Sequence, residues 1–404
     1  MEARLGYQAV PSGPGLQYDA PRASSAWSPA RPDVVGALTQ HAAPPYADVL
    51  GDEELVLDCR WLGLGGAGRV TELLLQRFQQ DPPPGSWKLW GSRARLEPLL
   101  FAGARIEADS RDPRSWFGQR TLTSIPSGDI VLYMHQIRPL RPGRSVTVIH
   151  DTIPLRYGGT LPVRRAKQAF FLAASRLSTL ILTDSEFSKR CIVRDLAVSP
   201  DKISVMRFPI DTERAARVAA LRDGLTQEDV LLYVGRFDSH KNLERLCTAF
   251  AASAFADQGG RLLLVGGAGR EIVRFRTWLA EAGIEGVELR LPCSETELDR
   301  LLASSSALVL PSFEEGYGLP AFEAVATGLP VAASSTGAIP ELLADTVRLF
   351  DPHDQADMTR AIDEVAGAPP ARARNLPESN LDTQVLASLA RALARGRDRA
   401  AQVA

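Results

Sequence analysis

The stretch Pro311-Ser-Phe-Glu-Glu-Gly-Tyr-Gly-Leu-Pro-Ala-Phe-Glu323 places two carboxylates eight residues apart, around two glycines. Glu315 lies in a loop after a predicted strand, and Glu323 lies early in a predicted helix. Gly316 and Gly318 let the backbone approach a ligand closely. The helix start directs backbone N–H groups and a positive dipole end to the same place. The pattern predicts carboxylates that accept hydrogen bonds from a hydroxyl-rich ligand such as ribose; a merely structural polar loop is the alternative.

Strands alternate with helices on both sides of this stretch, which predicts an α/β fold with two doubly wound parallel sheets. We expect domains at residues 51–215 and 225–375, joined by a linker near residue 220. Ligands of such sheets bind at the carboxyl ends of the strands, so two facing domains would form a cleft there. The predicted strands are Leu55–Asp58, Ile130–Tyr133, Ser145–Ile149, Leu180–Thr183, Val230–Val234, Arg261–Val265, Ala307–Leu310 and Pro330–Ala333. The longer predicted helices are Ala67–Gln79, Val163–Ser178, Leu243–Phe255, Glu295–Ala303 and Pro320–Ala326.

The two ends of the chain differ from these domains in composition. Residues 1–50 are rich in Pro, Gly, Ser and Ala without periodicity, which predicts a flexible or loosely packed extension. Residues 376–404 are expected to form a helix that crosses back to the N-terminal domain.

The net charge, the cysteines and the apolar runs of the chain argue against several classes of protein. A formal net charge of -2 over 404 residues gives no basic field that would attract nucleic acid. The four cysteines form no Cys-x-x-Cys pair, which argues against a disulfide framework or a zinc site. The sequence shows neither a signal peptide nor an apolar run of membrane-spanning length. A cytoplasmic protein is therefore expected, with peripheral contact at the inner membrane face as a further expectation. The excess of Arg over Lys and the abundance of Ala indicate a bacterial source.

The segment Val234-Gly-Arg-Phe-Asp-Ser-His-Lys-Asn242 follows another predicted strand. Arg236 and Lys241 would project from the carboxyl end of that strand, where two cations can bind a diphosphate. A solvated basic loop is the alternative for either residue alone. No Asp-x-Asp motif occurs in the chain, so the positive charge of Arg236, Lys241 and a helix N-terminus is predicted to replace a metal ion.

The glycine-rich turn Gly63-Leu-Gly-Gly-Ala-Gly-Arg69 follows the first predicted strand. It formally matches the dinucleotide fingerprint Gly-x-Gly-x-x-Gly, but the downstream region has Pro82-Pro-Pro-Gly85 instead of a strand ending in an acid. A tight turn that permits close helix packing is the structural alternative. A second polar pair, His150-Asp151, ends the predicted strand Ser145–Ile149 and should face the same edge.

These motifs together resemble glycosyltransferase family 4, retaining enzymes of the GT-B fold, from about Leu55 to Pro352 and most strongly from Leu231 to Glu341. The resemblance implies that Glu323 holds the ribose of a nucleotide-sugar donor and that Glu315 holds its sugar hydroxyls. Arg236 and Lys241 would contact the diphosphate. The remaining implied donor-binding residues are Gly65, Gly66, Gly316, Tyr317, Gly318 and Leu319. His150 would reach the donor sugar, and Asp151 would orient the acceptor or His150.

The resemblance predicts a retaining, metal-independent transfer of a hexose or deoxyhexose to an acceptor hydroxyl, without a cofactor. Bacterial polysaccharide or lipid-linked glycan assembly is the expected role, with glycosylation of a secondary metabolite as the alternative. The acceptor is accordingly a glycan, a lipid-linked glycan or a small molecule. Two other classes stay open on sequence grounds: an NAD(P)-dependent oxidoreductase using the Gly63–Gly68 turn, and a non-catalytic scaffold with the same fold.

Overall fold

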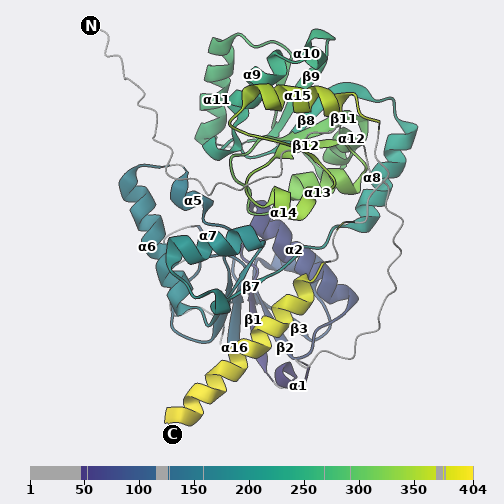
Figure 1. The fold of residues 1–404 in the computed structure, drawn as a ribbon. Coiled ribbons are helices and arrows are strands. Elements are labelled where there is room, and N and C mark those ends of the chain that lie inside the picture. Colours follow the sequence, from purple (N-terminus) through teal and green to yellow (C-terminus); the bar gives the residue numbers. More distant parts are fainter. Residues whose placement is uncertain are drawn as a thin grey trace.

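The computed structural model describes residues 47–51, 53–114, 126, 128–157, 159–267, 269–291, 293–369, 376 and 379–403. Two α/β domains are stacked one above the other in Figure 1, each built on a parallel sheet. The expected fold class is therefore confirmed. The predicted extension at residues 1–50 lies outside the described residues, except for the end that forms helix α1 (Ala47–Leu50), whose Leu50 is fully buried.

The N-terminal sheet has the strand order β3-β2-β1-β4-β5-β6-β7, and every described pairing is parallel. Its strands are β1 (Glu54–Asp58), β2 (Ser86–Gly91), β3 (Ala104–Ala108), β4 (Ile130–Tyr133), β5 (Ser145–Val148), β6 (Leu180–Thr183) and β7 (Ile203–Val205). Its helical segments are α2 (Gly65–Gln80), α3 (Arg93–Leu96), η1 (Glu97–Leu99), α5 (Ile153–Arg156), α6 (Leu161–Leu177), α7 (Glu186–Leu196) and η2 (Pro200–Lys202).

The C-terminal sheet has the order β10-β9-β8-β11-β12-β13 and is also parallel throughout. Its strands are β8 (Glu228–Gly235), β9 (Arg261–Gly266), β10 (Val287–Arg290), β11 (Ser305–Leu310), β12 (Val331–Ser334) and β13 (Arg348–Phe350). Its helical segments are α8 (Thr212–Gly224), η3 (Ser239–Lys241), α9 (Leu243–Ala251), α10 (Ala254–Asp257), α11 (Gly269–Ala282), α12 (Glu295–Ser304), α13 (Leu319–Ala326), α14 (Ile339–Leu343) and α15 (Gln355–Ala366).

The central strands are continuous apolar runs because helices cover both faces of a doubly wound sheet. In β8, the side chains of Leu231, Leu232 and Tyr233 are all fully buried. The last helix, α16 (Leu381–Val403), packs on α2 and on strands β4, β5, β6 and β7 of the N-terminal domain. Figure 1 shows this helix, in yellow, lying along the lower domain.

Several local predictions were wrong. The charged stretch interpreted as a linker near residue 220 is helix α8, which begins at an Asp211 side chain that accepts a hydrogen bond from the Arg214 amide (2.8 Å). This helix packs against α12 and α13 with Val218 fully buried. The helix predicted over Leu243–Phe255 breaks at Ser253, whose hydroxyl caps the separate helix α10. In both places, local side-chain capping set the boundaries.

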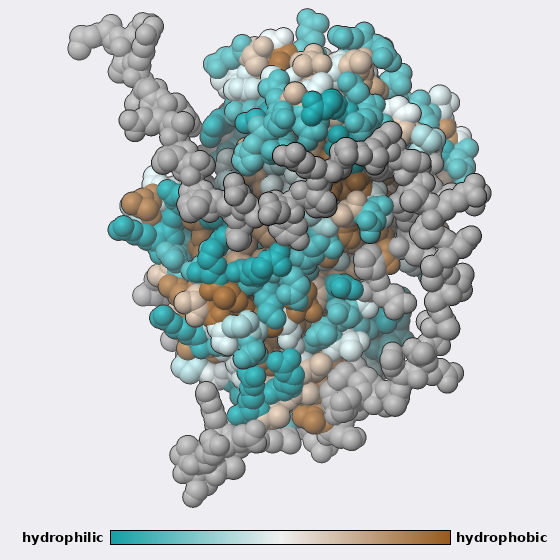
Figure 2. Space-filling view, in the orientation of Figure 1, coloured by the Kyte–Doolittle hydropathy of each residue, from teal (hydrophilic) through white to brown (hydrophobic). Residues whose placement is uncertain are grey.

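The surface gives no sign of a membrane-spanning segment. Among the described helices, none combines the length and hydrophobicity needed to cross a bilayer. Figure 2 shows hydrophilic residues over much of one face, with hydrophobic residues in small separate patches. Leu161 and Val163, at the start of α6, are among the exposed large hydrophobic residues.

Candidate functional site

Two of the predicted site residues, distant in sequence, meet at the carboxyl ends of neighbouring strands. Lys241 follows β8 and Glu315 follows β11, and these strands pair in the sheet. The Lys241 Nζ lies 2.7 Å from Glu315 Oε1, and both side chains are largely buried. The Ser312 hydroxyl also donates a hydrogen bond to Glu315. The carboxylate of Glu315 is thus held in one orientation by a cation and a hydroxyl group.

The loops that carry this pair are fastened to each other. Asn242 takes a left-handed backbone conformation (φ 57°), which asparagine tolerates better than most residues. Its side-chain amide donates to the carbonyls of Pro311 (3.1 Å) and Pro352 (2.9 Å). The amide of Phe313 donates to the carbonyl of His240 (2.8 Å). Asn242, which the sequence analysis did not single out, therefore positions the Lys241 loop on the Glu315 loop.

Arg236 lies at the same sheet edge but is not part of this contact. Its guanidinium pairs with Asp238 (2.7 Å), and its side chain is 79% exposed. The structure therefore brings Lys241 to Glu315 and leaves Arg236 at the surface. A bound diphosphate would have to draw Arg236 away from Asp238 for the two cations to act together.

Glu323 lies in the second turn of α13, facing a small cavity between the domains. The cavity is lined by Arg69 of α2, Arg214 of α8 and apolar residues that include Leu319 and Phe322. Glu323 accepts a hydrogen bond from Arg214 Nη1 (3.2 Å). Burial raises the pKa of Glu323, and the Arg214 guanidinium opposes that rise. Arg214 was missed in the sequence analysis because its helix was interpreted as a linker.

Gly316 and Gly318 lie between the two carboxylates, and each is needed for a different structural reason. Gly318 (φ 93°) ends the loop at the start of α13, and a Cβ there would lie 2.3 Å from Ile339 Cδ1. A Cβ at Gly316 would lie 3.1 Å from Asp151 Cβ of the other domain. The absence of a side chain at Gly316 thus lets this loop approach Asp151 of the N-terminal domain closely.

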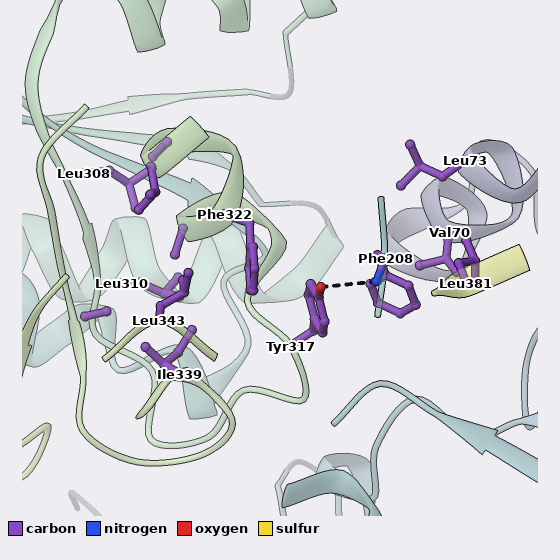
Figure 3. Close-up of a cluster of buried hydrophobic side chains, with 14 of the residues drawn as sticks. Val70, Leu73, Phe208, Leu308, Leu310, Tyr317, Phe322, Ile339, Leu343 and Leu381 are labelled. Carbon is purple, nitrogen blue, oxygen red and sulfur yellow. Dashed lines mark hydrogen bonds between the residues drawn. The ribbon is translucent and has the colours of Figure 1, made fainter. Parts of the chain in front are cut away.

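Tyr317 joins the two domains through its side chain. Figure 3 shows its ring between Phe322 of α13 and Phe208, in the segment that enters the C-terminal domain. The ring centroids lie 4.5 Å and 4.4 Å away, respectively. The Phe208 amide donates to the Tyr317 hydroxyl (3.2 Å). The ring is therefore occupied in packing, and only the backbone of this residue is available to line a ligand.

His150 lies at the end of β5 with both ring nitrogens in contact with oxygen atoms. Nδ1 is 2.9 Å from Asp184 Oδ2, and Nε2 is 3.1 Å from the Met134 carbonyl. Burial by itself would lower the pKa of His150, but the Asp184 carboxylate outweighs it and the pKa lies above its ordinary value. Both contacts are hydrogen bonds only when both nitrogens carry protons, so the arrangement favours the imidazolium.

Asp184, and not Asp151, orients His150, which corrects the expectation for Asp151. The reason is topological: β5 and β6 are adjacent and parallel, so residues just beyond their ends are neighbours. The signal was readable, because Asp184 follows Leu180–Thr183 as His150 follows its own strand. Asp151 instead accepts a hydrogen bond from the Ile153 amide (2.9 Å). Burial raises the pKa of Asp151 to about 6.

The glycine-rich turn leads into α2, and Gly65 and Gly66 are its first two residues. Gly65 has φ 61°, and a Cβ on either glycine would meet nothing within 4 Å. Farther along the helix, Arg69 reaches Glu295 of the other domain (3.6 Å). Space is therefore open at these two glycines, and α2 contacts the C-terminal domain through Arg69.

Additional contacts hold the domains together beside the site. The Glu341 carboxylate accepts hydrogen bonds from the amides of Glu186 (2.6 Å) and Phe187 (2.8 Å), at the start of α7. The Ser185 hydroxyl, which caps α7, also donates to the Gly316 carbonyl (2.8 Å). Arg156 pairs with Glu314 across the same boundary. The loop around Glu315 is thus fixed to the N-terminal domain on both sides.

The described residues contain no group of three or more His, Cys, Asp and Glu side chains placed to hold a metal ion. The carboxylates of the C-terminal edge are paired with Lys241 and Arg214. Whether the reaction needs a metal is not tested by this arrangement, and metal independence stays a prediction.

Comparisons with known proteins agree with this architecture. The model of the family described as glycosyl transferases group 1 matches residues 223–376. The O-antigen chain mannosyltransferase B of Escherichia coli is 26% identical over 279 residues, covering 64% of this chain and 69% of that relative. The MMP α-(1→4)-mannosyltransferase of Mycolicibacterium hassiacum is 30% identical over 198 residues, covering 47% and 46%. The match therefore spans about half of the second relative.

A solved structure shares the fold. The Anabaena protein HepE, in complex with UDP and glucose, superposes with a TM-score of 0.57 at 18% sequence identity. The superposition covers 86% of this chain and 95% of that one. The likeness therefore extends over both parallel-sheet domains and is not confined to the region that the family model matches.

Proposed function

We propose that this chain, a group 1 glycosyltransferase with the GT-B fold, transfers a hexose or deoxyhexose from a nucleotide diphosphate sugar to an acceptor hydroxyl. The contact between Lys241 and Glu315 carries the proposal. It puts a cation for a phosphate and a carboxylate for sugar hydroxyls side by side, at the sheet edge where ligands of parallel sheets bind.

The chemistry requires stabilisation of a leaving group. When the bond between sugar and diphosphate breaks, negative charge develops on the leaving oxygen, and fixed positive groups lower the barrier. Lys241 is placed for this role, and Arg236 can join it once it leaves Asp238. The start of α13 adds a positive dipole end. Because these groups supply positive charge, we propose that the reaction proceeds without a metal ion.

The N-terminal edge would complete the site from the opposite side. His150 would contact the donor sugar after its Nε2 leaves the Met134 carbonyl. Asp151 lies next to Gly316 and would orient the acceptor. We propose retention of the anomeric configuration, with the acceptor proton passing to the leaving phosphate.

The relatives support a proposal for the acceptor class. One of them is by name an O-antigen chain mannosyltransferase, which favours a polysaccharide or lipid-linked glycan acceptor in a bacterium. We propose that role for this chain, with the sugar donor carried by a nucleoside diphosphate, as UDP is bound in the HepE structure.

Calorimetric titration tests the donor site. UDP, GDP, ADP and dTDP are titrated in EDTA into the wild-type protein and into Lys241→Ala. We expect metal-free binding of one nucleotide, with Kd raised at least tenfold in the variant because a buried charge contact to phosphate is lost.

The matched control is Lys167→Ala, which removes a lysine from α6 of the other domain. Its Kd should equal that of the wild type. Absence of nucleotide binding by the wild-type protein, or equal binding by Lys241→Ala, would overturn the donor-site assignment and favour the scaffold alternative.

A further inference from the structure

Arg214 is a buried cation whose position fits the proposed donor site. Its side chain is 9% exposed and makes two ion pairs, to Asp299 through Nε (2.7 Å) and to Glu323 through Nη1 (3.2 Å). The third nitrogen, Nη2, is buried without a hydrogen-bond partner. Because the guanidinium is planar, the bond to Asp299 also fixes the direction in which Nη1 meets Glu323.

The cavity beside this pair lies between the two domains. Arg214 and Glu323 both line it, together with Leu319 and Phe322 of α13 and Leu73 of α2. Arg214 donates its hydrogen bond to Oε1 of Glu323, and the Glu323 side chain is 27% exposed. Since a carboxylate has about four lone-pair sites, the Glu323 carboxylate keeps room to accept two hydroxyl groups from a ligand.

We propose that Arg214 is a positioning residue for the ribose diol of the donor, which it serves by holding the Glu323 carboxylate ionised and in a fixed orientation. The inference rests on the proposed function, because it takes the ligand of Glu323 to be the ribose. Arg214 itself need not touch the donor. Its role is to keep both oxygens of Glu323 available as acceptors, since a protonated carboxyl group would turn one of them into a donor.

The charges around Glu323 determine the sign of the pH dependence. Burial raises the pKa of Glu323, and the positive charges of Arg214 and Arg69 lower it, while Glu295 raises it. The charged groups that face this carboxylate or line its cavity come from three elements and one capping position: Arg69 (α2), Arg214 (α8), Glu295 and Asp299 (α12) and Asp211 (N-cap of α8). Removal of Arg214 should therefore raise the pKa of Glu323 and weaken nucleotide binding most strongly at acidic pH.

The chain offers a matched control on the same helix. Arg222 lies eight residues after Arg214 on α8 and is equally buried at 7% exposure. Its Nη1 donates to the backbone carbonyls of Leu302 (3.1 Å) and Ser305 (3.0 Å), and no carboxylate of the site is involved. Arg222→Met thus removes a buried arginine from α8 without removing an ion pair of Glu323.

The test is calorimetric titration of wild type, Arg214→Met, Arg214→Lys and Arg222→Met in EDTA, from pH 5.5 to 8.5. The probes are UDP, GDP and ADP and the 2′-deoxy form of the tightest binder. We expect Arg214→Met to raise Kd by about tenfold at pH 8 and by more at pH 6, as loss of a charged hydrogen bond predicts. The penalty for the 2′-deoxy form should shrink in Arg214→Met and be retained in part in Arg214→Lys.

The titration distinguishes two ways in which the inference can fail. Protonation of the nucleotide itself is the same in the titrations of all variants, so differences in Kd between variants report on the protein. If Arg214→Met and Arg222→Met show the same pH profile and the same 2′-deoxy penalty, Arg214 is merely structural and the inference is overturned. If the wild type binds none of the three ribonucleotides, the proposed function and this inference fail together.

Discussion

The two sheet edges that face each other differ in how their carboxylates are paired. At the C-terminal edge, each carboxylate has a cation as partner: Lys241 for Glu315 and Arg214 for Glu323. At the N-terminal edge, Asp151 has no ion pair within 4 Å among the described residues, and its pKa is raised to about 6 by burial. The nearby imidazole of His150 is paired with Asp184 instead.

The difference indicates which edge is preorganised without a ligand. At the C-terminal edge, fixed cations hold the Glu315 and Glu323 carboxylates in place, and the Arg214 charge opposes the rise that burial causes in the pKa of Glu323. The N-terminal edge instead places a carboxylate where ionisation is unfavourable, against Gly316 of the opposite domain. Groups with perturbed pKa values are common at functional sites, which makes Asp151 a candidate functional residue of the N-terminal edge.

We expect the largest effect on activity from a substitution of Glu315, at the C-terminal edge. Glu315→Gln removes the charge that holds Lys241 Nζ, and we expect kcat to fall by about a thousandfold, the size observed for a lost preorganised electrostatic contact. The measurement is the initial rate of sugar transfer or donor hydrolysis with the nucleotide sugar that binds.

The neighbouring carboxylate supplies the control. Glu314→Gln changes a residue of the same loop that pairs with Arg156 of the other domain. Its kcat should stay within about tenfold of the wild type, since this part-buried ion pair joins the loop to the other domain and has no assigned contact with the donor. Equal losses of kcat in Glu315→Gln and Glu314→Gln would show that the loss comes from disturbing the loop and not from removing the Glu315 charge.

A smaller effect is expected at the N-terminal edge from Asp184→Asn. The folded-state pKa of His150 is raised by Asp184, so this pair stabilises the protein fully below pH 6.5 and loses that contribution as pH rises through the raised pKa. The variant should lower the free energy of unfolding by about 2 kcal/mol at pH 6 and by less at pH 9.

Urea unfolding at the two pH values measures this difference. Asp201→Asn, at an exposed position in η2, is the control and should leave the free energy of unfolding unchanged. A loss for Asp184→Asn that is the same at pH 6 and pH 9 would argue that His150 is neutral in the folded protein.

The smallest effect, and the one of opposite sign, is expected from Asp151→Asn. The folded-state pKa of Asp151, about 6, exceeds the ordinary value of 3.8, so the buried anion costs stability above pH 6, and that cost is lost as pH falls toward 4. The asparagine oxygen can still accept from the Ile153 amide. We expect a gain of about 1 kcal/mol at pH 8 that disappears at pH 4.

Thermal unfolding at pH 8 and pH 4 shows whether Asp151→Asn raises or lowers the stability of the protein. A destabilised Asp151→Asn protein at pH 8 would mean that the anion is favourably placed, which would remove the contrast between the two edges. Transfer activity of the same variant would then show whether that anion also serves the acceptor.

Much of the C-terminal edge was predictable because its residues occupy fixed places relative to strands. Lys241, Glu315 and Glu323 each follow an apolar run at a spacing that places them at the carboxyl end of a strand or in the helix after it. The comparisons support a glycosyltransferase and give no support to the oxidoreductase interpretation of the Gly63–Gly68 turn. In the structure, that turn leads into α2 beside the other domain.

Residues that act through partners distant in sequence were not predictable in the same way. Arg214 was hidden in a stretch with weak apolar periodicity, and Asn242 looked like an ordinary loop residue. Their partners lie 109 and 69 residues away in the chain. Only Asp184 carried a readable signal, its position directly after a strand adjacent to that of His150.

The sequence by itself determined the two parallel-sheet domains and the chemical types at the ends of their strands. Those follow from apolar runs, glycines and capping residues, which act over a few positions. The tertiary structure alone decided the pairing of charges: Lys241 with Glu315, Arg214 with Glu323 and Asp184 with His150. The reason is physical, since a buried charge is stabilised by whichever opposite charge lies within a few ångströms, and strand order, not sequence order, sets that distance.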